Sequence, residues 1–141
     1  MILEPRNAEE LRKIKPPRIV RAQDISFNRR VIDQKLANIL VLPSKNIKKD
    51  SLKYLDSGLN SIALRQASKN KIVLGIDLEY LRKLDKKQLS ENIARLSQDI
   101  KLARKCKVNL AYSNNKSDIG ARAFLRALGA STGQASRAIS F

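Results

Sequence analysis

Histidine is absent from the 141-residue chain, tryptophan is also absent, and cysteine occurs only once, as Cys106. A single cysteine cannot form a disulfide within the chain, which fits a reducing compartment such as the cytoplasm. The same counts exclude a zinc site built from cysteine and histidine. They also exclude any reaction that needs a histidine of this chain as its general base.

Long apolar runs and catalytic motifs are missing as well. No run approaches the ~20 apolar residues of a membrane span, and the N-terminal stretch MILEPRNAEELRK lacks the apolar core of a signal peptide. The five glycines are scattered, and none lies in a GxGxxG or GxxxxGK phosphate loop. No HExxH motif occurs, and no nucleophile elbow at a strand-to-helix turn is expected. We therefore expect a cytoplasmic protein without a recognisable catalytic motif.

Positive charge is what the chain has in excess. Lys and Arg number 29 against 13 Asp and Glu, a formal net charge of +16. A folded domain this basic usually meets a polyanion, since self-repulsion would otherwise cost it stability. Nucleic acid is the expected partner, with a membrane surface or a merely basic enzyme as alternatives. Aromatic residues are few, three Tyr and three Phe, so a base-stacking platform is not expected.

The stretch from Asp56 to Asp77 organises the predicted fold. Asp-Ser-Gly at 56–58 is a helix-entry signal, and the apolar residues that follow share one helical face. Lys69-Asn70-Lys71 suits a helix C-terminus. Ile72 to Ile76 is then a short apolar run typical of a buried parallel strand. Helix, turn and strand together form part of a βα repeat.

The same alternation extends along the rest of the chain. Further strands are predicted from 18 to 22, 38 to 42, 108 to 112 and 138 to 141, with helices after Asp24, from 86 to 107, from 118 to 128 and over a Ser131–Gln134 capping box. The longest helix carries an apolar stripe at residues 89, 93, 96, 100 and 103. Residues 1–17 form a charged arm with a short helix capped by Asn7, and residues 18–141 form one domain.

Strands that alternate with helices predict an α/β fold of parallel βα repeats with right-handed crossovers. A closed eight-stranded barrel takes ~250 residues. We therefore expect about half of a TIM-barrel-like fold. Such a sheet would leave edges and an apolar flank exposed, which favours a dimer or a bound partner over a monomer.

Charged side chains cluster near the predicted strand ends. The basic groups are Arg18 and Arg21, Arg29 and Arg30, the loop lysines Lys45, Lys48, Lys49 and Lys53, and finally Lys116, Arg122 and Arg126. Lys and Arg on loops neutralise phosphates, so we expect recognition of RNA by its backbone and shape. Asp24 and Asp77 follow two strands and could in principle hold Mg²⁺, although a helix cap and a salt bridge are the commoner roles of Asp.

An ordered set of segments resembles protein component 3 of archaeal ribonuclease P. The set comprises DISFNRR, the strand that ends at Pro43, DSGLN, VLGIDLEYL, ARKCKV, FLRALGAS and ASRAIS, over about residues 18 to 141. The resemblance implies a barrel-like α/β protein, one of several protein subunits around a catalytic RNA that removes the 5′ leader of precursor tRNA. The RNA and its Mg²⁺ ions would perform the chemistry, so this chain would be non-catalytic and hold no cofactor. The match begins after the family's first βα units.

The resemblance also implies partners and contacts. The family's usual partner is ribonuclease P protein component 2, with which it forms a heterotetramer on the catalytic domain of the RNA. Other protein subunits and, indirectly, precursor tRNA would complete the assembly. By position, Arg29, Lys49 and Lys116 match residues expected to touch RNA. The full set of predicted RNA-binding residues is Arg21, Arg29, Lys45, Lys48, Lys49, Lys53, Lys116 and Arg122.

Two other functions remain open from the residues alone. A small Mg²⁺-dependent phosphoesterase would use Asp24 and Asp77 on a phosphorylated substrate. A generic ribosome-associated RNA-binding protein would have the same high positive charge but would not be part of a ribonuclease P complex. Cleavage of RNA by the protein alone, lost on Asp77→Asn, would favour the phosphoesterase.

Overall fold

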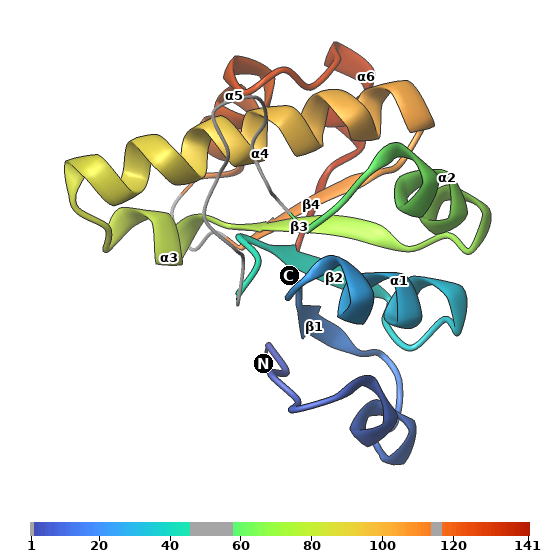
Figure 1. Ribbon diagram of the computed structural model, residues 1–141. Helices are drawn as coiled ribbons and strands as arrows, with labels where there is room; N and C mark the ends of the chain where they lie inside the picture. The colour runs from blue at the N-terminus through green and yellow to red at the C-terminus, as the bar shows by residue number, and fades with distance from the viewer. Residues whose placement is uncertain (1, 46–57, 114–116) are drawn as a thin grey trace.

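A single sheet of five parallel strands forms the centre of the computed structural model, which describes residues 2–45, 58–113 and 117–141 (Figure 1). The strands lie side by side in chain order. They are β1 (Ile19–Arg21), β2 (Ile39–Leu42), β3 (Val73–Asp77), β4 (Leu110–Ser113) and β5 (Ile139–Ser140). Strands laid down in chain order are the pattern of barrels, in which each βα unit adds its strand on the same side. Within the described ranges β1 and β5 do not pair, so the sheet is open.

In the described part of the chain, six α-helices connect or follow these strands. They are α1 (Ile25–Asp33), α2 (Ser61–Lys69), α3 (Leu78–Arg82), α4 (Lys86–Cys106), α5 (Asp118–Ala127) and α6 (Thr132–Arg137). Helix α1 packs against α2, α2 against α4, and α5 against α6. The predicted parallel α/β architecture is confirmed, and each strand begins one or two residues later than the sequence indicated.

Side-chain caps begin the helices. Asp24, Asp85 and Ser131 cap α1, α4 and α6 as predicted, and Ser131 forms a capping box with Gln134. The cap of α2 is Asn60, whose side chain accepts from the Ala63 N–H at 2.8 Å. The predicted entry signal at Asp56 and Ser57 lies outside the described residues.

Two helix starts differ further from the prediction. Helix α5 is capped by Ser117 rather than by Asp118, which is its first residue. Helix α3 was not predicted at all. It follows β3 with no intervening loop, because the Asp77 side chain accepts from the Tyr80 N–H and caps the turn that begins at Leu78.

The two faces of the sheet differ. Val20, Leu40, Leu74 and Leu110 share one row of the register and are fully buried, as expected for the face under the helices. Their neighbours in sequence point to the opposite face, since successive strand residues alternate. There the Phe141 ring lies over Gly75: a Cβ on Gly75 would be only 2.7 Å from Phe141 Cε1.

The N-terminal segment packs along β1. Leu3 forms a parallel bridge to Val20, and the 3-10 helix η1 (Ala8–Lys13), capped by Asn7, places Ala8 and Leu11 in the core. The predicted short helix is therefore present. No helix in the described part of the chain is long and apolar enough to cross a membrane.

Candidate nucleic-acid interface

The carboxyl ends of the strands form one rim of the sheet, and the polar side chains predicted to be functional begin there. Arg21 is the last residue of β1, Asp77 the last of β3 and Ser113 the last of β4. Pro43 follows β2 directly. Parallel strands bring these ends together, and in βα folds this rim is where binding and catalytic groups gather.

Arg21 and Asp77 form a buried ion pair that spans β2. The Arg21 Nη2 donates to Asp77 Oδ2, and both side chains are 9% exposed. Arg21 Nη1 also lies 3.4 Å from the Pro43 carbonyl oxygen, and the guanidinium carbon is 5.5 Å from the centroid of the Tyr80 ring. The guanidinium is thus held by groups of the protein on several sides, while its Nε has no hydrogen-bond partner.

The carboxylate of Asp77 is equally occupied. Its Oδ1 accepts from the Ser113 hydroxyl at 3.0 Å and from the Tyr80 N–H at 3.1 Å. Burial alone would raise the pKa of Asp77, but the hydrogen bonds from Arg21, Tyr80 and Ser113 and the charge of Arg21 outweigh it and lower that pKa. Asp77 therefore remains ionised at neutral pH, which makes it a poor general base.

The hypothesis of a magnesium site at Asp24 and Asp77 finds no support in this geometry. The Asp24 side chain caps α1 by accepting from the Phe27 N–H at 2.9 Å. Asp77 is committed to Arg21, Ser113 and the start of α3. Among the residues that the structure describes, no three His, Cys, Asp or Glu side chains lie together as metal ligands would.

Three of the predicted RNA-binding residues other than Arg21 lie in the described ranges, and their exposure differs. Lys45 follows β2 at the rim, where it is about half-exposed and pairs with Glu4 of the N-terminal segment. Arg29 is exposed on α1 and lines a shallow hollow with Asp33. Arg122 is half-buried on α5, and its Nη2 points to the Ala138 carbonyl oxygen at 3.4 Å. The structure therefore does not bring these three side chains to one rim.

The other predicted residues divide into two groups. Lys48, Lys49, Lys53 and Lys116 lie outside the described residues. Arg21 is described, but with 7% of its surface exposed and its guanidinium bound to Asp77 it has a structural role. We therefore leave Arg21 out of the surface proposed below. In the sequence, the Arg21–Asp77 ion pair was indicated only by opposite charges at the carboxyl ends of two predicted strands.

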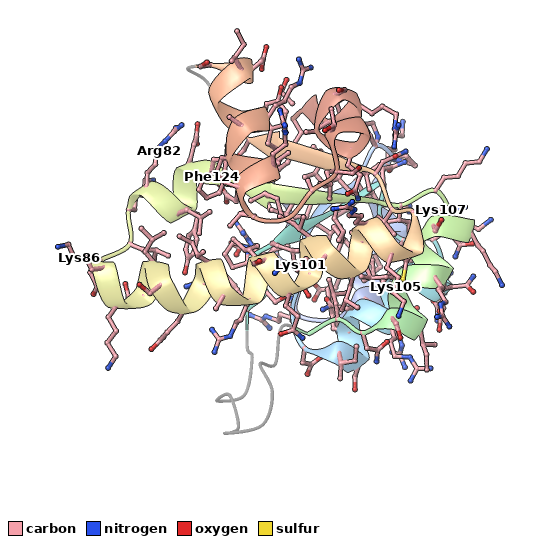
Figure 2. The ribbon with its side chains drawn as sticks, turned by 90° about the horizontal axis from the view of Figure 1, so that it is seen from above. Arg82, Lys86, Lys101, Lys105, Lys107 and Phe124 are labelled. Carbon is pink, nitrogen blue, oxygen red and sulfur yellow. The ribbon has the colours of Figure 1, made fainter. Side chains whose placement is uncertain are left out.

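From the sequence, Arg126 was grouped with Lys116 and Arg122 and not with Arg104, because Arg104 and Arg126 come from different helices. Arg104 of α4 and Arg126 of α5 line one polar hollow, together with Ser131 and Thr132 at the start of α6. The repeat of basic residues at 101, 104 and 105 was the signal in the sequence. Figure 2 shows α4 running beside the C-terminal helices α5 and α6, and this packing brings Arg126 to the hollow that Arg104 lines.

No family model matches the chain. Over 101 residues, 72% of this chain, it is 29% identical to Ribonuclease P protein component 3 of Methanococcus maripaludis, in strain C7 and equally in strain C6. It spans 40% of the length of these curated relatives.

A solved structure has a similar fold. The described chain superposes on a chain in the cryo-EM structure of archaeal Ribonuclease P with mature tRNA, with a TM-score of 0.70 and 22% sequence identity. That match covers 94% of this chain and 61% of the other. The chain is thus similar in sequence, over 72% of its length, to Ribonuclease P protein component 3, and in fold, over 94% of its length, to a chain in the structure of archaeal Ribonuclease P.

Proposed function

We propose that this chain is a protein subunit of ribonuclease P, where it binds and stabilises the catalytic RNA during removal of the tRNA 5′ leader. The observation that carries the proposal is the similarity to Ribonuclease P protein component 3 over 72% of the chain. The net charge of +16 supports it independently, because a protein this basic needs a polyanionic partner.

In this proposal the chain contributes to an endoribonuclease without performing its chemistry. The Mg²⁺ ions belong to the RNA of the assembly. The two carboxylates that could have served a phosphoesterase have other partners here: Asp24 caps α1, and Asp77 binds Arg21. No observation favours the phosphoesterase.

The RNA contacts we propose are to phosphates. The residues are Arg29, Lys45, Lys48, Lys49, Lys53, Lys116 and Arg122. Arg29 and Lys45 present charge to solvent from α1 and from the rim beside β2. Contacts of this kind fix the position of a protein on RNA and do not depend on the base sequence.

The proposed partners follow from the same resemblance. They are the ribonuclease P RNA, ribonuclease P protein component 2 and the other protein subunits, with precursor tRNA bound through the assembly. We place the complex in the cytoplasm.

Reconstitution tests the function. The chain is mixed with an archaeal ribonuclease P RNA and the other protein subunits, and release of the 5′ leader from precursor tRNA is measured with and without it. We expect cleavage to rise when the chain is added, and no cleavage by the chain alone in Mg²⁺. Robust cleavage by the chain alone, abolished by Asp77→Asn, would transfer the activity to this protein.

Binding provides the second test. The logarithm of affinity for the RNA should fall linearly with the logarithm of salt concentration, by about 0.7–0.9 for each phosphate contact. Arg29→Gln combined with Lys49→Gln should lower that slope, whereas Lys13→Gln with Lys15→Gln, an equal loss of charge on the N-terminal segment, should change it less. Affinity that does not respond to salt would contradict the proposal.

A further inference from the structure

The hollow between α4, α5 and α6 is polar, basic and remote from the rim. It is lined by Arg104, Arg126, Ser131, Thr132 and three alanines and has a volume of about 500 Å³. Arg104 lies two residues before the end of α4, which leads through Val108 to the start of β4. The hollow therefore belongs to the amino ends of the strands, whereas Lys45 and Asp77 lie at their carboxyl ends.

Among the residues with described positions, no acidic side chain lines this hollow. Over the ranges 2–45, 58–113 and 117–141, neither Arg104 nor Arg126 has an ion-pair partner. Lys101, whose stem lies against Gly129, adds a third positive charge near the hollow, whereas Figure 2 shows Lys105 on the side of α4 that faces away from α5 and α6. Like charges three or four residues apart on a helix repel one another. An anion in the hollow would relieve that repulsion.

The parts of the hollow are held at fixed positions by contacts beneath it. The Ser97 hydroxyl donates to the Leu128 carbonyl at 2.8 Å and joins α4 to the end of α5. Gly129, with φ near +120°, lets the Lys101 stem lie so close that a Cβ there would be 2.9 Å from Lys101 Cγ. The buried Gln134 side chain donates to the Val108 carbonyl at 3.1 Å and holds α6 against the sheet. These contacts fix the backbone around the hollow, so binding would order mainly the exposed Arg104 and Arg126 side chains.

The chemistry of the lining selects for phosphate oxygens. An Arg guanidinium offers a planar fork of donors that fits a phosphate in a bidentate manner. The Ser131 Oγ already accepts from the Gln134 N–H at 3.0 Å, so its own proton is available to a ligand, and Thr132 adds a second hydroxyl. Arginines and hydroxyls that contact phosphates recognise the nucleic-acid backbone and do not distinguish between bases.

We infer that the α4–α6 hollow binds the phosphodiester backbone of RNA. The inference rests on the proposed function and extends it, because it gives the chain a second RNA contact surface at the end of the sheet opposite the rim. A protein with two such surfaces holds two segments of one folded RNA at a fixed separation.

A pair of charge-matched variants tests the inference. Arg104→Gln with Arg126→Gln removes two positive charges from the hollow, and Lys86→Gln with Lys87→Gln removes two from the far end of α4. Affinity for ribonuclease P RNA is measured as a function of salt for both. The first variant should lower the salt slope by about 1.4–1.8, the value for two phosphate contacts, and the second should change it less. Thermal unfolding of each variant checks that the fold is intact.

A conservative variant separates geometry from charge. Arg104→Lys with Arg126→Lys keeps both charges and loses the guanidinium fork, so affinity at physiological salt should fall to a value between those of wild type and the Gln variant. Equal slopes for the Arg104/Arg126 and Lys86/Lys87 variants would overturn the inference. Binding to phosphatidylserine vesicles that requires Arg104 and Arg126, with RNA binding unchanged, would also overturn it and assign the hollow to a membrane surface.

The same measurements distinguish failure of the inference from failure of the proposed function. Suppose that wild type binds ribonuclease P RNA and that replacing Arg104 and Arg126 does not change the salt dependence of its affinity. The inference about the hollow is then wrong, and the proposed function stands. Suppose instead that wild type binds ribonuclease P RNA and an unrelated RNA duplex equally well, and that both RNAs need Arg104 and Arg126 for binding. The proposed function then fails, and the inference that the hollow binds RNA stands.

Discussion

Removing the charge of Asp77 should be among the most destabilising single changes in this chain. Asp77→Asn keeps a side-chain oxygen for the Tyr80 N–H and for Ser113, and Asn is as good a helix cap as Asp. What the change removes is the partner of the buried Arg21 guanidinium. Breaking a buried pair from one side costs about 3–5 kcal/mol, because the other charge remains desolvated. A domain of ordinary stability has about 5–15 kcal/mol in total.

Urea denaturation followed by circular dichroism measures this loss at pH 7. A double-mutant cycle with Arg21→Met then separates the pair from the rest of the site. The Asp77→Asn, Arg21→Met double variant should recover most of the stability lost by Asp77→Asn alone, since it no longer contains a buried guanidinium without a charged partner. Asp77→Ala should be less stable than Asp77→Asn by about 0.5–2 kcal/mol, because the cap of α3 is lost as well.

The pH dependence of the same two proteins checks the direction of the pKa shift. The pKa of Asp77 is lowered on folding, so its stabilising contribution is present above the ordinary value of 3.8 and is lost as pH falls through the folded value. The stability gap between wild type and Asp77→Asn should therefore be constant from pH 7 to about pH 5 and shrink below about pH 4. A loss under ~1 kcal/mol at neutral pH, or a gap that widens in acid, would refute the reasoning.

Three other changes have expected outcomes. Gly75→Ala places a methyl group 2.7 Å from the Phe141 ring and should cost about 1–3 kcal/mol in urea denaturation; an unchanged midpoint would show that the ring moves aside freely. Ser131→Ala removes the cap of α6 and should cost about 1 kcal/mol, with faster amide exchange at Gln134 as its local signature. Wild type should self-associate at micromolar concentration in light scattering, and Ile139→Lys, at a residue 56% exposed on β5, should reduce the association. A wild-type monomer would contradict the last expectation.

The repeating architecture was predictable because its signals are local. Apolar runs such as the one at 38–42 identified the strands, and the stripe that includes Leu96, Ile100 and Ala103 identified α4, where all three are buried. Caps with a hydroxyl or carboxylate just before an apolar stretch located the starts of α1, α4 and α6. Helix α3 was not predicted because its five residues are too few to show the hydrophobic periodicity of a helix.

The candidate site was less predictable because it depends on distance in space. Arg21 and Asp77 are 56 residues apart in sequence, so nothing local distinguishes a paired arginine from one that is free for RNA. The hollow at Arg104 and Arg126 likewise exists only when α4 and α5 pack together. Charge content predicts that a chain meets a polyanion, whereas the folded structure decides which charges remain available.

The length of α4 shapes the approach to the rim. At ~1.5 Å per residue its 21 residues span about 31 Å, while the five residues of β3 span about 17 Å. Because α3 continues directly from the end of β3 and α4 turns back from there, both helices stand beyond the strand ends as a wall (Figure 1). Among the described residues, this wall closes the rim on the side of α3 and the start of α4. If the rim contacts RNA as proposed, a rigid duplex would have to approach it from another side than that of α3.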